Sequence, residues 1–303
     1  MLVHKAMHTF ITARPARVLV ALCALTAAAC GKPADTTPAQ GALTVQLSRP
    51  RVALGSPVDI TYKFTLAGDA TNLGARKVFV HFMDADGEQM WTDDHDPPTP
   101  TSSWRPGQTV EYTRTVFAPV YPYVGQAKIV AGLYDPSSGD RVKFSGTDAG
   151  GRAYETTQFE LLPQTENIFL IFKDGWHAVE AATDNSMVEW QWTKKEATLA
   201  FRNPRRDAVL YFQADNPGKA ATAATKVELR LGDQVLATVA LGADGPVHKI
   251  PLTAAAMGSG DMVELRLVVD QTFVPALEPG AQSNDPRELG ARVFHAFVQP
   301  QGS

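Results

Sequence analysis

The stretch "DDHDPP" places three carboxylates beside an imidazole. Carboxylate oxygens and an imidazole nitrogen can ligate a divalent cation, and an acid beside a histidine can raise the histidine pKa. Two prolines follow at once, which favours a loop in which the acids are solvated or cap the backbone. The sequence leaves both interpretations open and predicts no other cofactor. The candidate cation ligands are Asp93, Asp94, His95 and Asp96.

A second acidic run, "DADGE", precedes this cluster and begins at Asp84. Asp and Gly tolerate the backbone angles of a tight turn, so the run predicts a hairpin. Alternating acids also begin a calcium loop, but the twelfth position is His95 instead of a bidentate glutamate. A glycoside hydrolase needs only two carboxylates placed by the fold, so a hydrolase using acids of residues 84–96 stays an alternative.

An aromatic pair offers a different chemistry. Trp190 and Trp192 alternate in "EWQW" and therefore lie on one face of a strand. Two indoles on one face can stack on the C–H faces of sugar rings, or they can fill a core. Three polar residues are expected near this strand, to bind sugar hydroxyls or to pin loops by charge-assisted hydrogen bonds. They are His177, Asp285 and Arg287.

The elements that position these residues have the two-residue period of β-strands. Residues 58–66, "VDITYKFTL", alternate apolar and polar side chains, and residues 109–117 and 127–134 do the same. Turns are expected at "SRPRVALGSP", "RPGQ" and "DPSSGD". The sequence therefore predicts an immunoglobulin-like β-sandwich over residues 42–163.

A second group of apolar runs follows from residue 167 to residue 300. Nine short strand candidates and little helix signal predict another antiparallel sandwich, of jelly-roll or galactose-binding type. The segment "TAAAMGSG" is long enough only for a helical turn. The candidates are "NIFLIF", "MVEWQWT", "ATLAF", "AVLYFQA", "KVELRLG", "QVLATVAL", "HKIPL", "MVELRLVV" and "RVFHAFV". The overall expectation is an all-β chain of two tandem sandwiches.

The first 29 residues have another character. Lys5, Arg14 and Arg17 precede an apolar run over residues 18–29, which predicts a secretory signal peptide. The run is shorter than the roughly 20 residues that span a bilayer. Its end, "LTAAAC", resembles the lipobox of bacterial lipoproteins, and this implies lipidation of Cys30. Gly31 in place of aspartate implies sorting to the outer membrane, facing the periplasm or the surface, and residues 30–41 form a polar tether.

Charge and cysteine content narrow the partners. Loss of the signal peptide removes three cations and no acid, so the formal charge changes from -4 to -7. Nucleic acid is therefore not expected as a partner. Cys23 leaves with the signal peptide and Cys30 carries the lipid, so no disulfide is predicted. The expected membrane contact is the lipid anchor.

Two longer segments resemble known domains. Residues 78–144, with "VHFMDADG", "WRPG" and "GLYDPSSGDR", resemble the sandwich appended to bacterial membrane glycosyltransferases. Residues 175–298, with "EWQW" and "DPRELG", resemble the other accessory sandwich of such glycan-assembly proteins. The resemblance implies a non-enzymatic envelope lipoprotein that binds polysaccharide or assists glycan biology. A lipoprotein that binds an envelope protein is the alternative.

Overall fold

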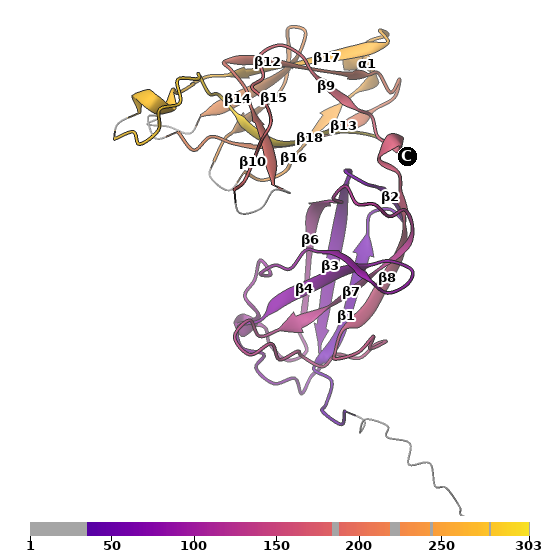
Figure 1. The fold of residues 1–303 in the computed structure, drawn as a ribbon. Helices are drawn as coiled ribbons and strands as arrows, with labels where there is room; N and C mark the ends of the chain where they lie inside the picture. Colours follow the sequence, from indigo (N-terminus) through magenta and orange to yellow (C-terminus); the bar gives the residue numbers. More distant parts are fainter. Residues whose placement is uncertain (1–34, 184–187, 219–224, 243–244, 279, 303) are drawn as a thin grey trace, which may run out of the picture. The chain divides into compact units, whose positions relative to one another are not determined.

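The computed structural model describes residues 35–183, 188–218, 225–242, 245–278 and 280–302. Their regular secondary structure is almost entirely β-strand, with one short α-helix, α1 (Ala254–Met257), and three short 3-10 turns (Figure 1). Within these ranges no helix combines the length and the apolar character that a bilayer crossing requires. The predicted signal peptide and the lipidated Cys30 lie outside the described residues. The all-β expectation is confirmed.

The first sandwich pairs a three-stranded sheet, β1-β3-β6, with a five-stranded sheet, β2-β8-β7-β4-β5. With strands lettered in chain order, these are the A-B-E and G-F-C-C′ sheets of an immunoglobulin-like fold, with β2 added at the G edge. Its strands are β1 (Gly41–Leu47), β2 (Arg51–Ala53), β3 (Pro57–Leu66), β4 (Lys77–Met83), β5 (Gln89–Thr92), β6 (Thr109–Phe117), β7 (Gly125–Tyr134) and β8 (Tyr154–Leu162).

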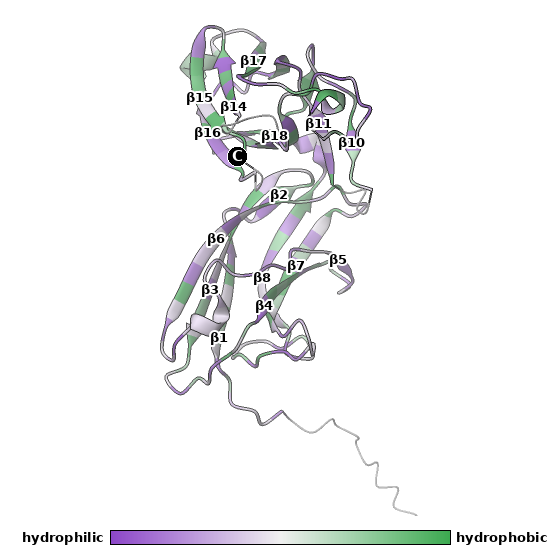
Figure 2. Ribbon diagram, turned by 90° about the vertical axis from the view of Figure 1, so that its left-hand side faces the viewer, coloured by the Kyte–Doolittle hydropathy of each residue, from purple (hydrophilic) through white to green (hydrophobic). Residues whose placement is uncertain are grey.

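Strand β3 alternates buried and outward-facing residues, as its two-residue period predicts. Ile60, Tyr62 and Phe64 are fully buried, while the residues between them face outward. Figure 2 shows such alternation as green and purple bands along the strands. The strand pleat sends successive side chains to opposite faces, so one face of β3 packs on the core and the other meets water.

One predicted turn is a strand in part. Within residues 48–57 the structure forms β2, which pairs in parallel with the last strand of the sandwich, Val52 opposite Leu161. Val52 and Leu161 are each 1% exposed, so burial of two apolar side chains draws this short segment into the sheet. The turn proper begins at Gly55, whose φ of 78° suits glycine.

The second sandwich has two five-stranded sheets, β10-β11-β18-β13-β16 and β15-β14-β17-β12-β9. Without the edge strands β9 and β10, the order is that of an eight-stranded jelly roll, and every pairing is antiparallel. Its strands are β9 (Leu170–Phe172), β10 (Glu180–Ala181), β11 (Glu189–Trp192), β12 (Glu196–Arg202), β13 (Ala208–Asp215), β14 (Lys226–Leu231), β15 (Gln234–Ala240), β16 (His248–Leu252), β17 (Met262–Val269) and β18 (Arg292–Pro300).

All nine predicted runs of this region contain a strand, and the Ala-rich segment contains α1, whose Thr253 hydroxyl accepts a hydrogen bond from the Ala256 amide. The two-residue β10 was not predicted, because a strand of that length has no measurable period. The sandwiches have separate cores: residues 43–161 supply one hydrophobic cluster and residues 197–298 supply the other.

Strand β17 provides a direct test of the second core. Leu265 is fully buried and Met262, on the same strand, is 46% exposed. We expect Leu265→Ala to lower the free energy of unfolding by about 2–5 kcal/mol, because it removes buried methyl groups and leaves a cavity. Met262→Ala should change it by less than about 0.5 kcal/mol. Denaturant unfolding measures both values, and equal losses would contradict the assignment of this face to the core.

Candidate functional site

Trp190 lies on the outer face of the sheet β10-β11-β18. Glu180 of β10 is its cross-strand partner, and the register of β11 with β18 places Phe294 on its other side. Residues directly opposite each other in an antiparallel pair share a face, so these side chains form a row. The Trp190 and Phe294 rings meet edge to face with centroids 6.1 Å apart. The indole is half-buried and keeps part of its surface free.

Arg292 makes a cation–π contact with the Trp190 indole. Its guanidinium carbon lies 5.3 Å from the Trp190 ring centroid and 5.7 Å from that of Trp192. Its Nε and Nη2 atoms donate hydrogen bonds to the two carboxylate oxygens of Asp215, at 2.7 and 2.6 Å, and Asp215 is 4% exposed. A bidentate ion pair of this kind holds the guanidinium in one orientation, and the cation attracts the faces of the rings.

The two tryptophans have different environments. Trp192 is 6% exposed, yet it is absent from the hydrophobic cluster between the sheets. It lies on the outer face, where its ring packs edge to face on Phe273 at 5.6 Å. The predicted alternatives, core or sugar platform, therefore separate: Trp192 is covered by a loop, and Trp190 alone of the pair presents surface.

A chain of three charged side chains begins at Trp190. Glu180 accepts a hydrogen bond from the indole nitrogen at 3.3 Å and pairs with Arg287 at 2.7 Å. Arg287 also donates to both oxygens of Asp285, at 2.7 to 3.0 Å. These hydrogen bonds lower the pKa of Asp285, so it stays ionised. The structure thus links Trp190 to Arg287 and Asp285 through Glu180.

His177 lies at the edge of this group, hereafter the tryptophan site (Trp190, Glu180, Asp285, Arg287 and His177). One ring nitrogen, Nε2, is 2.8 Å from the Glu288 carbonyl, and the His177 carbonyl accepts a hydrogen bond from Gln191. The histidine therefore joins the strand β11 to the loop that carries Asp285 and Arg287. An exposed aromatic face beside fixed donors and acceptors can contact both the C–H faces and the hydroxyls of a sugar.

The acidic stretch has a different arrangement. Asp93 receives two hydrogen bonds from Arg114, at 3.0 and 3.3 Å, and Asp94 accepts one from the Val80 amide. Asp96 pairs with Lys77 at 3.4 Å. Asp84 caps the hairpin between β4 and β5 by accepting the Glu88 amide, as the turn interpretation predicts. Each of these carboxylates is held by its own neighbour.

His95 is buried in the first sandwich, with 6% exposure. Its Nδ1 is 2.8 Å from the Asp93 carbonyl, and its Nε2 is 2.8 Å from the Tyr112 hydroxyl. In the neutral tautomer that fits these partners, Nδ1 donates to the carbonyl and the hydroxyl donates to Nε2. Among the described residues no three His, Cys, Asp or Glu side chains converge as a metal site would require. The structure does not bring Asp93, Asp94, His95 and Asp96 together around a cation.

Five arginines were missed by sequence reasoning. They line one pocket, and two short segments carry them: "RPR" at residues 49–51 and "RNPRR" at residues 202–206. Each segment alone is an ordinary polar loop, and about 150 residues separate them. The signal that could have found them is the local excess of arginine in an acidic chain.

Comparisons with known proteins assign no family. No family model and no curated protein matches the chain. Among solved structures it is similar to "pT26-6p" at 7% identity and a TM-score of 0.23, over 87% of this chain and 64% of that one. Similar too are the collagen adhesin (CNA) from S. aureus (7%, 0.17, over 87% and 98%) and the collagen binding domain of Erysipelothrix rhusiopathiae surface protein RspB (7%, 0.15, over 85% and 96%). TM-scores of this size carry no argument about function.

The burial of His95 predicts a pH dependence of stability. Desolvation lowers its pKa below the usual 6.5, so the unfolded chain takes up a proton more readily than the folded one. The free energy of unfolding should therefore fall as the pH is lowered from about 7 to 5. Denaturant unfolding across this range measures the slope. His95→Gln should reduce the slope without abolishing it, because burial also lowers the pKa of His81 and of His295. An unchanged slope in that variant would contradict the prediction.

Proposed function

We propose that this protein is a non-enzymatic glycan-binding lipoprotein of the bacterial cell envelope. The observation that supports this most is Trp190, an indole with free surface, braced by Arg292 and bordered by ordered charged groups. In this proposal a lipid on Cys30 anchors the chain in the outer membrane, and the polar residues 32–41 connect the anchor to the sandwiches.

The tryptophan site fits a saccharide for two physical reasons. A pyranose has an apolar C–H face that can lie on an indole, and burying aromatic area favours association. Its hydroxyls both donate and accept, which matches the carboxylates of Glu180 and Asp285 and the guanidinium of Arg287. Because this network is already formed, little side-chain entropy is lost on binding.

The test is calorimetric titration of the purified full-length protein with envelope polysaccharide from the producing organism. We expect saturable binding that Trp190→Ala weakens at least tenfold, because the variant removes the stacking surface. Phe169→Ala is the matched control, since Phe169 is 57% exposed and lies outside the tryptophan site. Equal affinity of wild type and Trp190→Ala, or an equal loss in both variants, would overturn the proposal.

A second candidate function has its own observation. Strand β9 lies at the edge of its sheet, and Phe169, Ile171 and Phe172 at this edge are 57%, 53% and 41% exposed. An open edge with apolar side chains can take an added strand from another protein. This favours a protein-interaction lipoprotein of an envelope complex.

The two candidates give different results in a cross-linking experiment on cells. If β9 docks a partner, Ile171→Lys should strongly reduce the cross-linked partner, because a charge would be buried at the new strand pair. Trp190→Ala should leave it unchanged. Retention of the same partner by Ile171→Lys would rule out the edge as its binding site.

A further inference from the structure

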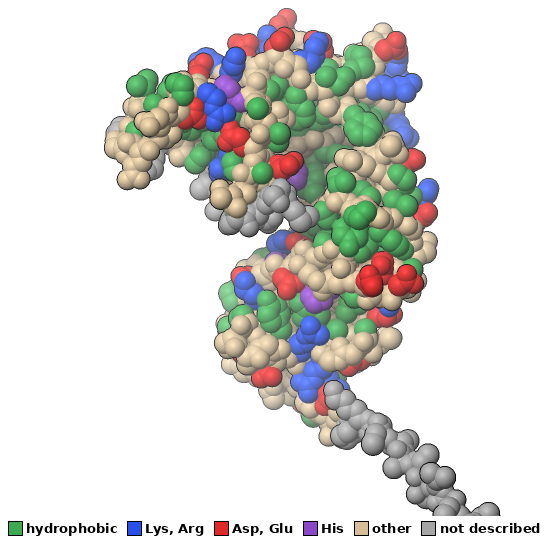
Figure 3. All heavy atoms as spheres, in the orientation of Figure 1, with side chains coloured by type: hydrophobic (Ala, Val, Ile, Leu, Met, Phe, Trp, Pro, Cys, Tyr) green, Lys and Arg blue, Asp and Glu red, His purple; other side chains and the backbone are tan. Residues whose placement is uncertain are grey.

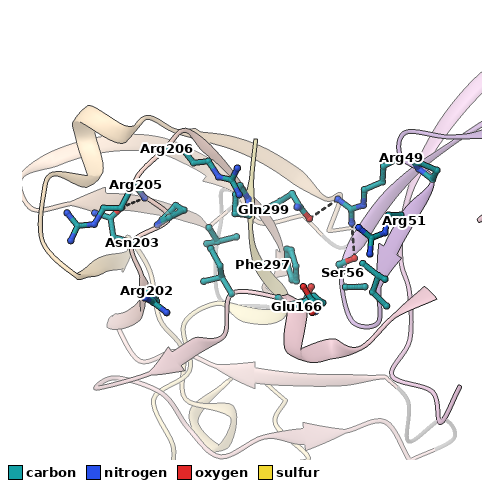
Figure 4. A pocket seen from close by; sticks show the side chains of 18 residues that line it. Arg49, Arg51, Ser56, Glu166, Arg202, Asn203, Arg205, Arg206, Phe297 and Gln299 are labelled. Atoms are coloured by element: carbon teal, nitrogen blue, oxygen red, sulfur yellow. Dashed lines mark hydrogen bonds between the residues drawn. The ribbon is translucent and has the colours of Figure 1, made fainter. Parts of the chain in front are cut away.

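A pocket of about 840 Å³ opens where the end of β18 faces the loop after β1 and the loop between β12 and β13 (Figure 4). Pockets for small ligands commonly have volumes of about 300–1,000 Å³. Phe297, 8% exposed, supplies apolar surface within it. The pocket is thus large enough for one or two sugar-sized groups, and it is separate from the residues of the tryptophan site.

The lining of this pocket is strongly cationic. It contains five arginines and a single carboxylate, Glu166, in a chain whose formal charge is -4. On the face drawn in Figure 3, by contrast, acidic and basic side chains are interspersed. An arginine cluster in a recess attracts an anion more strongly than scattered surface charges do. We call this cavity the arginine pocket. Its arginines are Arg49, Arg51, Arg202, Arg205 and Arg206.

Among the described residues, two of the five pocket arginines have a carboxylate partner. Arg51 pairs with Glu160 at 3.0 Å, and Arg205 pairs with Asp261 at 2.6 Å. Within the part of the chain that the structure describes, the Arg202 and Arg206 guanidinium groups make no hydrogen bond or ion pair. Figure 4 shows them on the side of the pocket opposite Arg49 and Arg51. They are free to pair with an incoming oxyanion.

Arg49 is a partly buried cation whose hydrogen-bond partners are all neutral. It donates to the Gln299 side chain at 2.7 Å, to the Ser56 hydroxyl at 2.8 Å and to the Pro57 carbonyl at 2.6 Å. Burial lowers its pKa despite the nearby Asp59, because desolvation disfavours the charged form. An anion in the pocket would offset that cost.

The loop that follows Arg202, the last residue of β12, and carries Arg205 and Arg206 is held in place. The Asn203 side chain is buried and donates to the Gly258 and Gly260 carbonyls, each at 3.0 Å, while its oxygen accepts the Arg205 amide at 2.9 Å. Arg205 has a φ of 58°, a conformation that such a cap stabilises. A fixed loop places its guanidinium groups without loss of backbone entropy on binding.

We propose that the arginine pocket binds a small ligand that carries a carboxylate or a phosphate, such as an acidic sugar unit. Guanidinium groups pair bidentately with either oxyanion, and the Phe297 ring can contact the apolar part of the same ligand. The identification of that ligand as a sugar rests on the proposed function. The binding of the oxyanion rests on the pocket alone.

The test is titration of the purified full-length protein with glucuronate, with glucose 1-phosphate and with neutral glucose. We expect at least one of the two anions to bind at least tenfold more tightly than glucose, and the better one identifies the oxyanion. Arg202→Ala with Arg206→Ala in one variant should weaken that binding at least tenfold. Arg105→Ala is the control, because it removes one exposed cation outside the pocket.

The proposal is overturned if neither anion binds, if neutral glucose binds as tightly, or if the double variant keeps the wild-type affinity. An equal loss in Arg105→Ala would also overturn it, since general charge and not the pocket would then govern binding. Trp190→Ala must leave anion binding unchanged. The double variant is also titrated with neutral polysaccharide. If the polysaccharide binds although no anion does, the arginine-pocket proposal fails and the proposed function stands.

Discussion

A bulge in β18 sets which side chains this strand contributes to the tryptophan site and which it contributes to the arginine pocket. The register with β13 shifts between Gln213 and Ala214, so that Gln213 faces His295 while Ala214 faces Val293, and Phe294 is the extra residue. Without it, a period of two would send one half of β18 to the wrong face. With it, Val293, Ala296 and Val298 all contact the core.

The outer face of β18 then carries two different chemistries. Before the bulge it presents Arg292 and Phe294, which support the Trp190 indole. After the bulge it presents Phe297 and Gln299, which line the arginine pocket. Arg292 is flanked by β11 and β13, whereas Phe297 and Gln299 are paired with β13. The bulge at Phe294 thus decides which β18 side chains face the tryptophan site and which face the arginine pocket.

The sequence predicted the strands far better than it predicted the sites. Runs such as "VDITYKFTL" and "MVELRLVV" carry their own periodicity, and each forms a strand at the expected place. Short elements fail this test: β2 and β10 form only because they pair with β8 and β11. The side chains of "DDHD" are neighbours in sequence, yet alternation and tight turns send them to Arg114, Val80, Tyr112 and Lys77.

The tryptophan site was partly predictable, because two tryptophans alternate along its strand. The arginine pocket was not predictable, because its two arginine-rich segments meet only in the folded chain. The arginines near Trp190 and those of the arginine pocket also differ in whether a carboxylate pairs with them. Arg292 and Arg287 are paired with carboxylates, and the buried pair with Asp215 would be costly to break, by about 3–5 kcal/mol for loss of one partner. Arg49 has no such carboxylate within ion-pair distance among the described residues, and Arg202 and Arg206 have no partner there.

Arg49 is partly buried without a carboxylate partner among the described residues, and a charge withdrawn from water without one opposes folding. Local departures from such rules concentrate where a protein meets a ligand. In the proposed function, Arg287 and Arg292 near Trp190 are paired with carboxylates and support the binding surface. In the proposed anion site, Arg49, Arg202 and Arg206 have no carboxylate partner among the described residues and would contact the oxyanion, while Arg51 and Arg205 keep their own carboxylates.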